Sequence, residues 1–391
     1  MNNNSISTRM QDISPFYVMD LLAQAKQLEA EGHDVIHLEV GEPDFPTPQS
    51  IKTAAINAID AGQTKYTAAT GLPELKQSIA HYYQQRLNTI INPANIIITT
   101  GASGALQLAL SVLVNRGQGV LMADPGYPCN RHFVRLLEAS AHSIAVDAST
   151  QYQLSAEIIE QNWQTNTTAV LIASPSNPTG TIISQTEMQK IINVVESKNG
   201  ILLVDEIYQG LVYDQPDFSA TALSPNVFVI NSFSKFFSMT GWRLGWLVVP
   251  NDFIEPIDRL AQNLFLAPPT ISQYAALSAF ESDTLKVLDK QRDELKQRRD
   301  FLVQGLSELG FDIHVKPAGA FYIYANITKF SDDSFSFCNR LLHHSHVAIT
   351  PGIDFGEHNA SQYVRFAYTQ NLEKLQLALD RISDFLTLYK N

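Results

Sequence analysis

Residues 231–245 read NSFSKFFSMTGWRLG and place one lysine, Lys235, among serines and aromatic side chains. An apolar run at 227–230 precedes the stretch and a second run at 247–249 follows it. This pattern predicts a loop between two buried strands, and loops on a rigid scaffold often carry function. Because a lysine in an apolar setting loses hydration, its neutral and nucleophilic amine becomes accessible.

The polar residues of the same stretch suit a phosphate group. Ser232 and Ser234 offer hydroxyl donors, and Arg243 offers planar, bidentate recognition. A neutral lysine amine reacts with aldehydes, and pyridoxal phosphate (PLP) carries both an aldehyde and a phosphate. The stretch therefore favours a PLP site, although a Ser-x-Ser-Lys sequence by itself is more often a solvated surface segment.

The whole stretch resembles the cofactor-lysine motif of the class I/II PLP-dependent aminotransferases, which are the aspartate-aminotransferase-like enzymes of fold type I. Segments similar to that family follow in family order from about Ser14 to Phe385. The resemblance implies an α/β fold with a three-layer α/β/α large domain around a mostly parallel sheet, residues 45–285. A smaller α/β domain would combine residues 1–44 and 286–391.

The hydrophobic pattern supports the large domain independently of the resemblance. Short apolar runs occur near residues 96, 120, 169, 201, 227 and 245, and helix-length segments separate most of them. Strands that alternate with helices in this way are typical of a parallel sheet covered by helices.

Composition limits the class of protein. The 391 residues are 45% hydrophobic and 17% charged, which is typical of a packed globular chain. The net charge of −12 argues against a nucleic-acid surface. Cys129 and Cys338 are too few for a disulfide framework, and residues 1–10 lack the signature of a signal peptide. No apolar run approaches the ~18 residues of a membrane span, so we expect a cytoplasmic protein.

Several further segments could contact the cofactor. The predicted strand at 96–100 turns through Gly101, Ala102 and Ser103 into a helix, and such a turn presents free N–H groups to an anion. By itself this signal is weak. Tyr127 follows another strand, where open α/β sheets bind their ligands, and its ring could stack on a pyridine.

Two more polar residues follow later strands. Asn177 lies between prolines in the segment SPSNPTG and can donate to a phenolate oxygen. Asp205 ends a predicted buried strand, where a carboxylate is costly unless it is paired. A protonated pyridine nitrogen would pair it, and a helix N-cap role is the alternative.

The resemblance implies a role for each matching residue. Those implied for catalysis are Lys235, Asp205 and Tyr208. Those implied for cofactor binding are Gly101, Ala102, Ser103, Tyr127, Asn177, Asp205, Tyr208, Ser232, Ser234, Lys235, Arg243 and Tyr66. Those implied for the substrate carboxylate are Gly41, Asn177 and Arg365. By pattern alone Arg365 would face solvent and Tyr66 would be a packing residue.

The implied reaction moves an amino group from an L-amino acid to a 2-oxo acid, 2-oxoglutarate or pyruvate, with ping-pong kinetics. In the family, the residue matching Tyr66 reaches the cofactor of a neighbouring subunit, which implies a homodimer with shared active sites. The same motifs serve cysteine-conjugate β-lyases, so that activity stays open. A PLP-binding transcription regulator is a remote alternative, because such proteins carry an N-terminal DNA-binding domain and only about 13 residues precede Ser14.

The preferred substrate is open at this stage. We expect residues 13–17 and 263–266 to line the side-chain pocket. Phe16 and Tyr17 suggest an apolar or aromatic lid, whereas Arg131 could meet a second carboxylate.

A histidine cluster, His343, His344 and His346, could suggest a metal site. It lacks companion ligands at metal-binding spacing, so a solvated helix end before a strand is the better interpretation. We expect no metal.

Overall fold

The computed structural model describes residues 6–389, and its centre is a seven-stranded sheet. The strand order is β2-β8-β7-β6-β5-β3-β4. Neighbouring strands run parallel except at β8, which is antiparallel to both β2 and β7. The predicted mostly parallel sheet is therefore confirmed. The strands are β2 (Ile96–Thr99), β3 (Gly119–Asp124), β4 (Ser140–Ala145), β5 (Thr167–Ala173), β6 (Ile201–Asp205), β7 (Phe228–Ser232) and β8 (Gly245–Val248).

Side chains alternate along each strand, so both faces of this sheet carry apolar side chains, and helices cover both faces. On one face, Leu171 and Leu203 pack with residues of α4 (Gly101–Leu113) and α8 (Ile254–Leu264). On the other face, Val170 and Leu202 pack with residues of α3 (Pro73–Leu87) and α7 (Gln185–Ser197). These layers form the predicted three-layer α/β/α arrangement. The remaining helices around the large sheet are α2 (Gln49–Asp60), α5 (Pro128–Leu136), α6 (Ala156–Gln161) and α9 (Thr270–Leu277).

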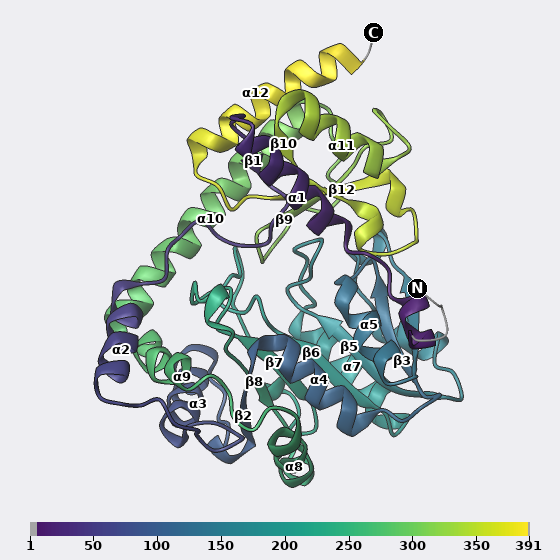
Figure 1. Cartoon of the computed structure of the whole chain (residues 1–391). Coiled ribbons are helices and arrows are strands. Elements are labelled where there is room, and N and C mark those ends of the chain that lie inside the picture. Colours follow the sequence, from purple (N-terminus) through teal and green to yellow (C-terminus); the bar gives the residue numbers. More distant parts are fainter. Residues whose placement is uncertain (1–5, 390–391) are drawn as a thin grey trace.

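A second group of elements lies above the large sheet, and the long helix α10 (Ser282–Glu308) runs up to it (Figure 1). Its antiparallel small sheet has the order β11-β12-β9, and β1 pairs with β10. The N-terminal helix α1 lies among these C-terminal elements (Figure 1). Their bounds are α1 (Tyr17–Ala30), β1 (Ile36–His37), β9 (Tyr322–Asn326), α11 (Ser334–Ser345), β10 (Val347–Ala348), β11 (Thr350–Pro351), β12 (Tyr363–Ala367) and α12 (Leu372–Tyr389).

The boundaries at residues 45–285 and at 1–44 with 286–391 stay a prediction. Residues 1–5 and 390–391 lie outside the described residues. The first of these ranges is half of the segment 1–10 that lacks a signal-peptide signature. Within residues 6–389, no helix combines the length and the apolar character needed to cross a bilayer.

Two local features differ from what the sequence suggests. Ser14-Pro15 reads as a helix cap followed by a first-turn proline, but α1 begins at Tyr17, and the residue at its N-cap, Phe16, supplies no side-chain hydrogen bond. Instead, the first N–H groups of α1 donate to a carboxylate more than 300 residues away. Strand β4 was not expected, because an edge strand has no continuous apolar run to reveal it, and its Ser140, Ser143 and Ala145 are exposed.

Candidate active site

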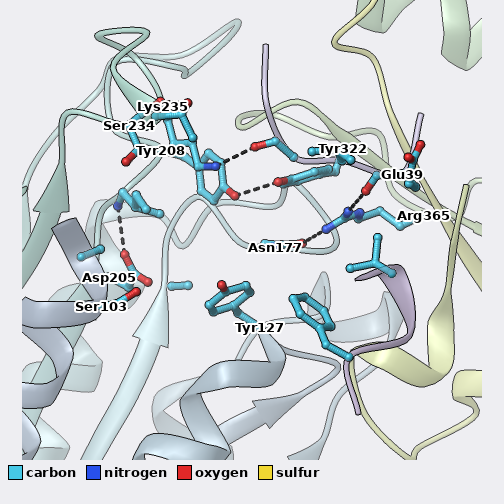
Figure 2. A pocket seen from close by; sticks show the side chains of 18 of the residues that line it. Glu39, Ser103, Tyr127, Asn177, Asp205, Tyr208, Ser234, Lys235, Tyr322 and Arg365 are labelled. Atoms are coloured by element: carbon cyan, nitrogen blue, oxygen red, sulfur yellow. Dashed lines mark hydrogen bonds between the residues drawn. The ribbon is translucent and has the colours of Figure 1, made fainter. Parts of the chain in front are cut away.

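A cavity of about 250 Å³ lies at the carboxyl ends of strands β5, β6 and β7, between the large and small sheets. Parallel strands bring their carboxyl ends to one edge, where α/β proteins bind ligands. The cavity gathers most of the residues that the sequence singled out: Gly41, Ala102, Ser103, Tyr127, Asn177, Asp205, Tyr208, Ser234, Lys235, Arg243 and Arg365. In Figure 2, Asp205 and Ser103 lie at one end of the cavity and Arg365 at the other.

Lys235 follows β7 and extends across the cavity. Its Nζ donates to the backbone oxygen of Gly41 at 2.6 Å. The rings of Tyr208 and Phe321 lie 5.9 and 5.7 Å from Nζ. Burial lowers the pKa of Lys235 to about 8, although the Glu42 carboxylate acts in the opposite direction. A substantial fraction of this amine is therefore neutral near physiological pH, as the aromatic setting suggested.

Asp205 ends β6 and is only 5% exposed. Its Oδ1 accepts from the N–H of Ile207 at 3.0 Å, and no other hydrogen bond to this carboxylate occurs among residues 6–389. No α-helix starts here, so Asp205 is not a helix N-cap. Burial raises the pKa of Asp205 to about 6, and the nearby Lys235 offsets part of the rise. A further cation in the cavity would stabilise the ionised form of Asp205.

Arg365 lies on β12 and is 4% exposed, so the solvent-facing alternative is excluded. Its Nη1 donates to Oδ1 of Asn177 at 2.8 Å, and its Nη2 donates to Oγ1 of Thr350 at 3.1 Å and to the backbone oxygen of Glu39. The guanidinium carbon lies 4.2 Å from the ring centroid of Tyr322. These contacts fix the orientation of a buried cation, and its Nε is unpartnered among the described residues.

Phosphate-type donors gather where α4 begins. Ser103 and Arg243 line the cavity beside the first turn of this helix. Gly101 has a φ of +73°, and a Cβ there would lie 2.7 Å from Nη2 of Arg243, so a larger residue would strain the backbone and displace the guanidinium. Ser232 does not line the cavity; it is buried and donates from Oγ to Oγ of Ser234 at 2.9 Å. It therefore orients a lining residue.

Sequence reasoning missed Tyr322, whose hydroxyl bonds that of Tyr208 at 2.9 Å. The same hydroxyl lies so close to Gly41 that any Cβ at residue 41 would clash with it. The contacts of Tyr322 with the cavity join residues far apart in the chain, so no local sequence pattern could indicate them. Three side chains of α1 that line the cavity, Val18, Met19 and Leu22, were also missed.

Several expected residues lie away from the cavity. Tyr66 is 82% exposed, and this single chain does not bring it to the site. Residues 263–266 do not line the cavity either. Arg131 instead donates from Nη2 to the backbone oxygen of Asp354 at 3.2 Å. Phe16 lines the cavity, whereas the ring of Tyr17 packs against Phe335 at 5.3 Å.

The histidine cluster is a helix end, as expected. His343 and His344 lie exposed in the last turn of α11, and His346 follows as its C-cap. Among the residues that the structure describes, no group of three or more histidine, cysteine or acidic side chains could hold a metal ion.

The donor set of the cavity fits PLP. A buried amine with a lowered pKa suits its aldehyde, and the hydroxyls of Ser103 and Ser234 with Arg243 and the N-terminus of α4 suit its phosphate. The buried carboxylate of Asp205 suits a protonated ring nitrogen.

Comparisons with known proteins give the same picture. Residues 33–382 match the model of the protein family described as "Aminotransferase class I and II". The chain is 38% identical over 384 residues to the (5-formylfuran-3-yl)methyl phosphate transaminase of Methanocaldococcus jannaschii, covering 97% of this chain and 99% of that one. It is 37% identical to the valine–pyruvate aminotransferase of Mycobacterium tuberculosis, with coverage of 96% and 97%.

Solved structures agree over the same length. A crystal structure of an aminotransferase from Mycobacterium tuberculosis matches with a TM-score of 0.94 and 36% identity, covering 98% of this chain and 99% of that one. Aspartate aminotransferase from Thermus thermophilus with maleate matches with a TM-score of 0.92 and 29% identity, covering 97% and 99%.

Proposed function

Because the chain belongs to the class I and II aminotransferases, which use PLP to move an amino group from an amino acid to a 2-oxo acid, we propose that its preferred donors are L-amino acids with apolar or aromatic side chains. One wall of the cavity carries this proposal: it is built from Phe16, Val18, Met19 and Leu22. Within residues 6–389, the only basic side chains that line the cavity are Lys235, Arg243 and Arg365. Among residues 6–389, no further basic side chain lines this cavity to pair with a second substrate carboxylate.

We also propose how the residues share the work. Arg365 holds the α-carboxylate of the substrate, because it is a buried and fixed cation on the cavity wall. Its contact with Asn177 supports a position for that amide beside the same carboxylate. The neutral amine of Lys235 carries the proton that leaves the substrate Cα, and its lowered pKa suits this task near neutral pH.

The other roles concern the cofactor. PLP, when bound, supplies an electron sink for the charge that develops at the substrate Cα. We propose that Asp205 keeps the ring nitrogen protonated and that the Tyr208 hydroxyl, held by Tyr322, donates to the ring oxygen. Tyr127 covers a ring face, and Gly101 to Ser103 with Ser234 and Arg243 hold the phosphate.

We further propose a homodimer in which Tyr66 completes the partner's site. Tyr66 is 82% exposed in the single chain, so its side chain is free to contact a second chain. Other exposed apolar residues lie at Ile56, Ile59, Leu264 and Leu266. The free thiols of Cys129 and Cys338 support a reducing, cytoplasmic location.

The substrate proposal is tested with a panel of L-amino acids and a fixed 2-oxo acid. We expect kcat/KM for L-leucine or L-phenylalanine to exceed that for L-aspartate by roughly tenfold or more, since burial of a large apolar side chain stabilises binding by about 1.5–3 kcal/mol. Initial-rate plots at several acceptor concentrations are expected to be parallel, as in a ping-pong reaction. A preference for L-aspartate would contradict the proposal.

The lowered pKa of Lys235 predicts how the apoprotein takes up PLP. Only the neutral amine attacks the aldehyde, so the rate of uptake should rise with pH and level off above about 8. The measurement is stopped-flow absorbance across a pH series, with the reaction of PLP and N-acetyl-lysine as a control for titration of PLP itself. A rate that rises as far as the ordinary lysine value, 10.5, would show that burial does not tune this amine.

A further inference from the structure

The helix α1 receives its N-terminal cap from a distant residue, Asp354. Oδ1 of Asp354 accepts from the N–H of Tyr17 at 2.8 Å, and Oδ2 accepts from the N–H of Val18 at 2.8 Å. The carboxylate is thus bidentate on the first turn of a helix that offers no side-chain cap of its own. Charge-assisted hydrogen bonds at the positive end of a helix dipole are among the stronger contacts of this kind.

The same residue is held from the large-sheet side. Asp354 ends a short 3₁₀ helix, Gly352–Asp354, and is 2% exposed. Its backbone oxygen accepts from Nη2 of Arg131 on α5 at 3.2 Å. The next residues continue the attachment: the backbone oxygen of Phe355 accepts from Gly126 at 2.8 Å, and the N–H of Glu357 donates to Asp124 at 2.9 Å.

Asp354 also lies near the end of the cavity where Arg365 is located. The ring of Phe355 lies 4.8 Å from the guanidinium carbon of Arg365. Burial raises the pKa of Asp354 to about 6, while its two N–H contacts and the charges of Arg365 and Arg131 oppose the rise. Near neutral pH the group is therefore a carboxylate, the form that accepts both hydrogen bonds.

From these contacts we infer that Asp354 is a positioning residue for substrate choice: it fixes the first turn of α1 over the part of the cavity that receives the substrate side chain. The turn that it caps supplies Val18 and Met19 to the cavity wall, and Phe16, which immediately precedes the turn, lines the same wall. When the cap is lost, the first turn of α1 is no longer held in place, and the side chains of this wall become less ordered. A long side chain then loses its contacts, whereas the methyl group of alanine is too short to depend on them. This inference rests on the proposed preference for apolar donors.

The test compares Asp354→Ala and Asp354→Asn with Ser184→Ala. Ser184 is the control, because it caps a different helix, α7, accepting from the N–H of Glu187 at 3.2 Å, and no residue of α7 lines the cavity. For each purified holoenzyme, kcat/KM is measured with L-alanine and with the best long-chain donor of the wild-type enzyme. Circular dichroism checks that each variant folds, and Asp354→Asn keeps the shape and one acceptor should the alanine variant fail to fold.

We expect the ratio of kcat/KM for the long donor to that for alanine to fall roughly fivefold or more in Asp354→Ala, with a smaller fall in Asp354→Asn. The change should appear mainly in KM of the long donor, and Ser184→Ala should leave the ratio within about twofold. An unchanged ratio in folded Asp354 variants, or an equal fall in Ser184→Ala, would overturn the inference. The two proposals fail separately, because the wild-type panel alone decides the substrate class.

Discussion

Replacing Lys235 with alanine is expected to lower kcat for transamination by at least about 10⁴-fold. The change removes the amine to which we assign both the attack on the cofactor aldehyde and the transfer of the Cα proton. General acid–base catalysis alone contributes roughly 10²–10⁴-fold. Nothing nearby replaces it: within the described residues, no other lysine lines the cavity. The near-visible absorbance of the protein-bound cofactor should shift as well, because the covalent link to the protein is lost.

Lys76→Ala is the matched control for this experiment. Lys76 is also partly buried, with a pKa lowered chiefly by burial, but it lies on α3 and contacts Thr70 instead of the cavity. Its activity and spectrum should stay near those of the wild-type enzyme. Substantial transamination by Lys235→Ala, measured as 2-oxo acid formed in single and multiple turnovers, would contradict the role assigned to this amine.

The second large effect is expected for Asp205→Asn. The asparagine can keep the contact with the N–H of Ile207, so the fold should hold, but the negative charge in the buried end of the cavity is lost. In the proposed site, Asp205 pairs with the protonated ring nitrogen of PLP. Removing one partner of a buried ion pair costs about 3–5 kcal/mol. If that cost falls on the transition state, kcat/KM should drop by roughly two to four powers of ten.

Asp217→Asn separates this effect from a general loss of buried charge. Burial also raises the pKa of Asp217 to about 6, and its carboxylate accepts from Gly210, yet it does not line the cavity. We expect its kcat/KM to change by less than about tenfold. Comparable activity losses in the two variants would show that Asp205 has no special part in the reaction.

Much of the fold and the site follows from local sequence signals. Apolar runs predicted the strands of the sheet, and they placed Asp205 at the end of one strand and Lys235 just after another. Parallel strands bring their carboxyl ends together, so the two residues were expected to lie near each other. Short signals of this kind depend only on neighbours along the chain. Edge strand β4 escaped for the converse reason, since its half-exposed residues carry no apolar run.

Long-range contacts were beyond such signals. The cap of α1 by Asp354 and the approach of Tyr322 to Gly41 join residues hundreds of positions apart. The burial of Arg365 contradicted the ordinary preference of arginine for solvent, and the family resemblance, not the pattern, indicated it. The role of Tyr66 stays a prediction, because it depends on a second chain.

The most direct test is to follow the absorbance spectrum of the purified holoenzyme during each half-reaction. We predict that L-leucine or L-phenylalanine converts the near-visible band to a pyridoxamine-like spectrum at lower concentration than L-aspartate does, and that a 2-oxo acid then restores the band. A band that persists while a cysteine conjugate yields ammonia and pyruvate would contradict amino transfer and identify a β-lyase.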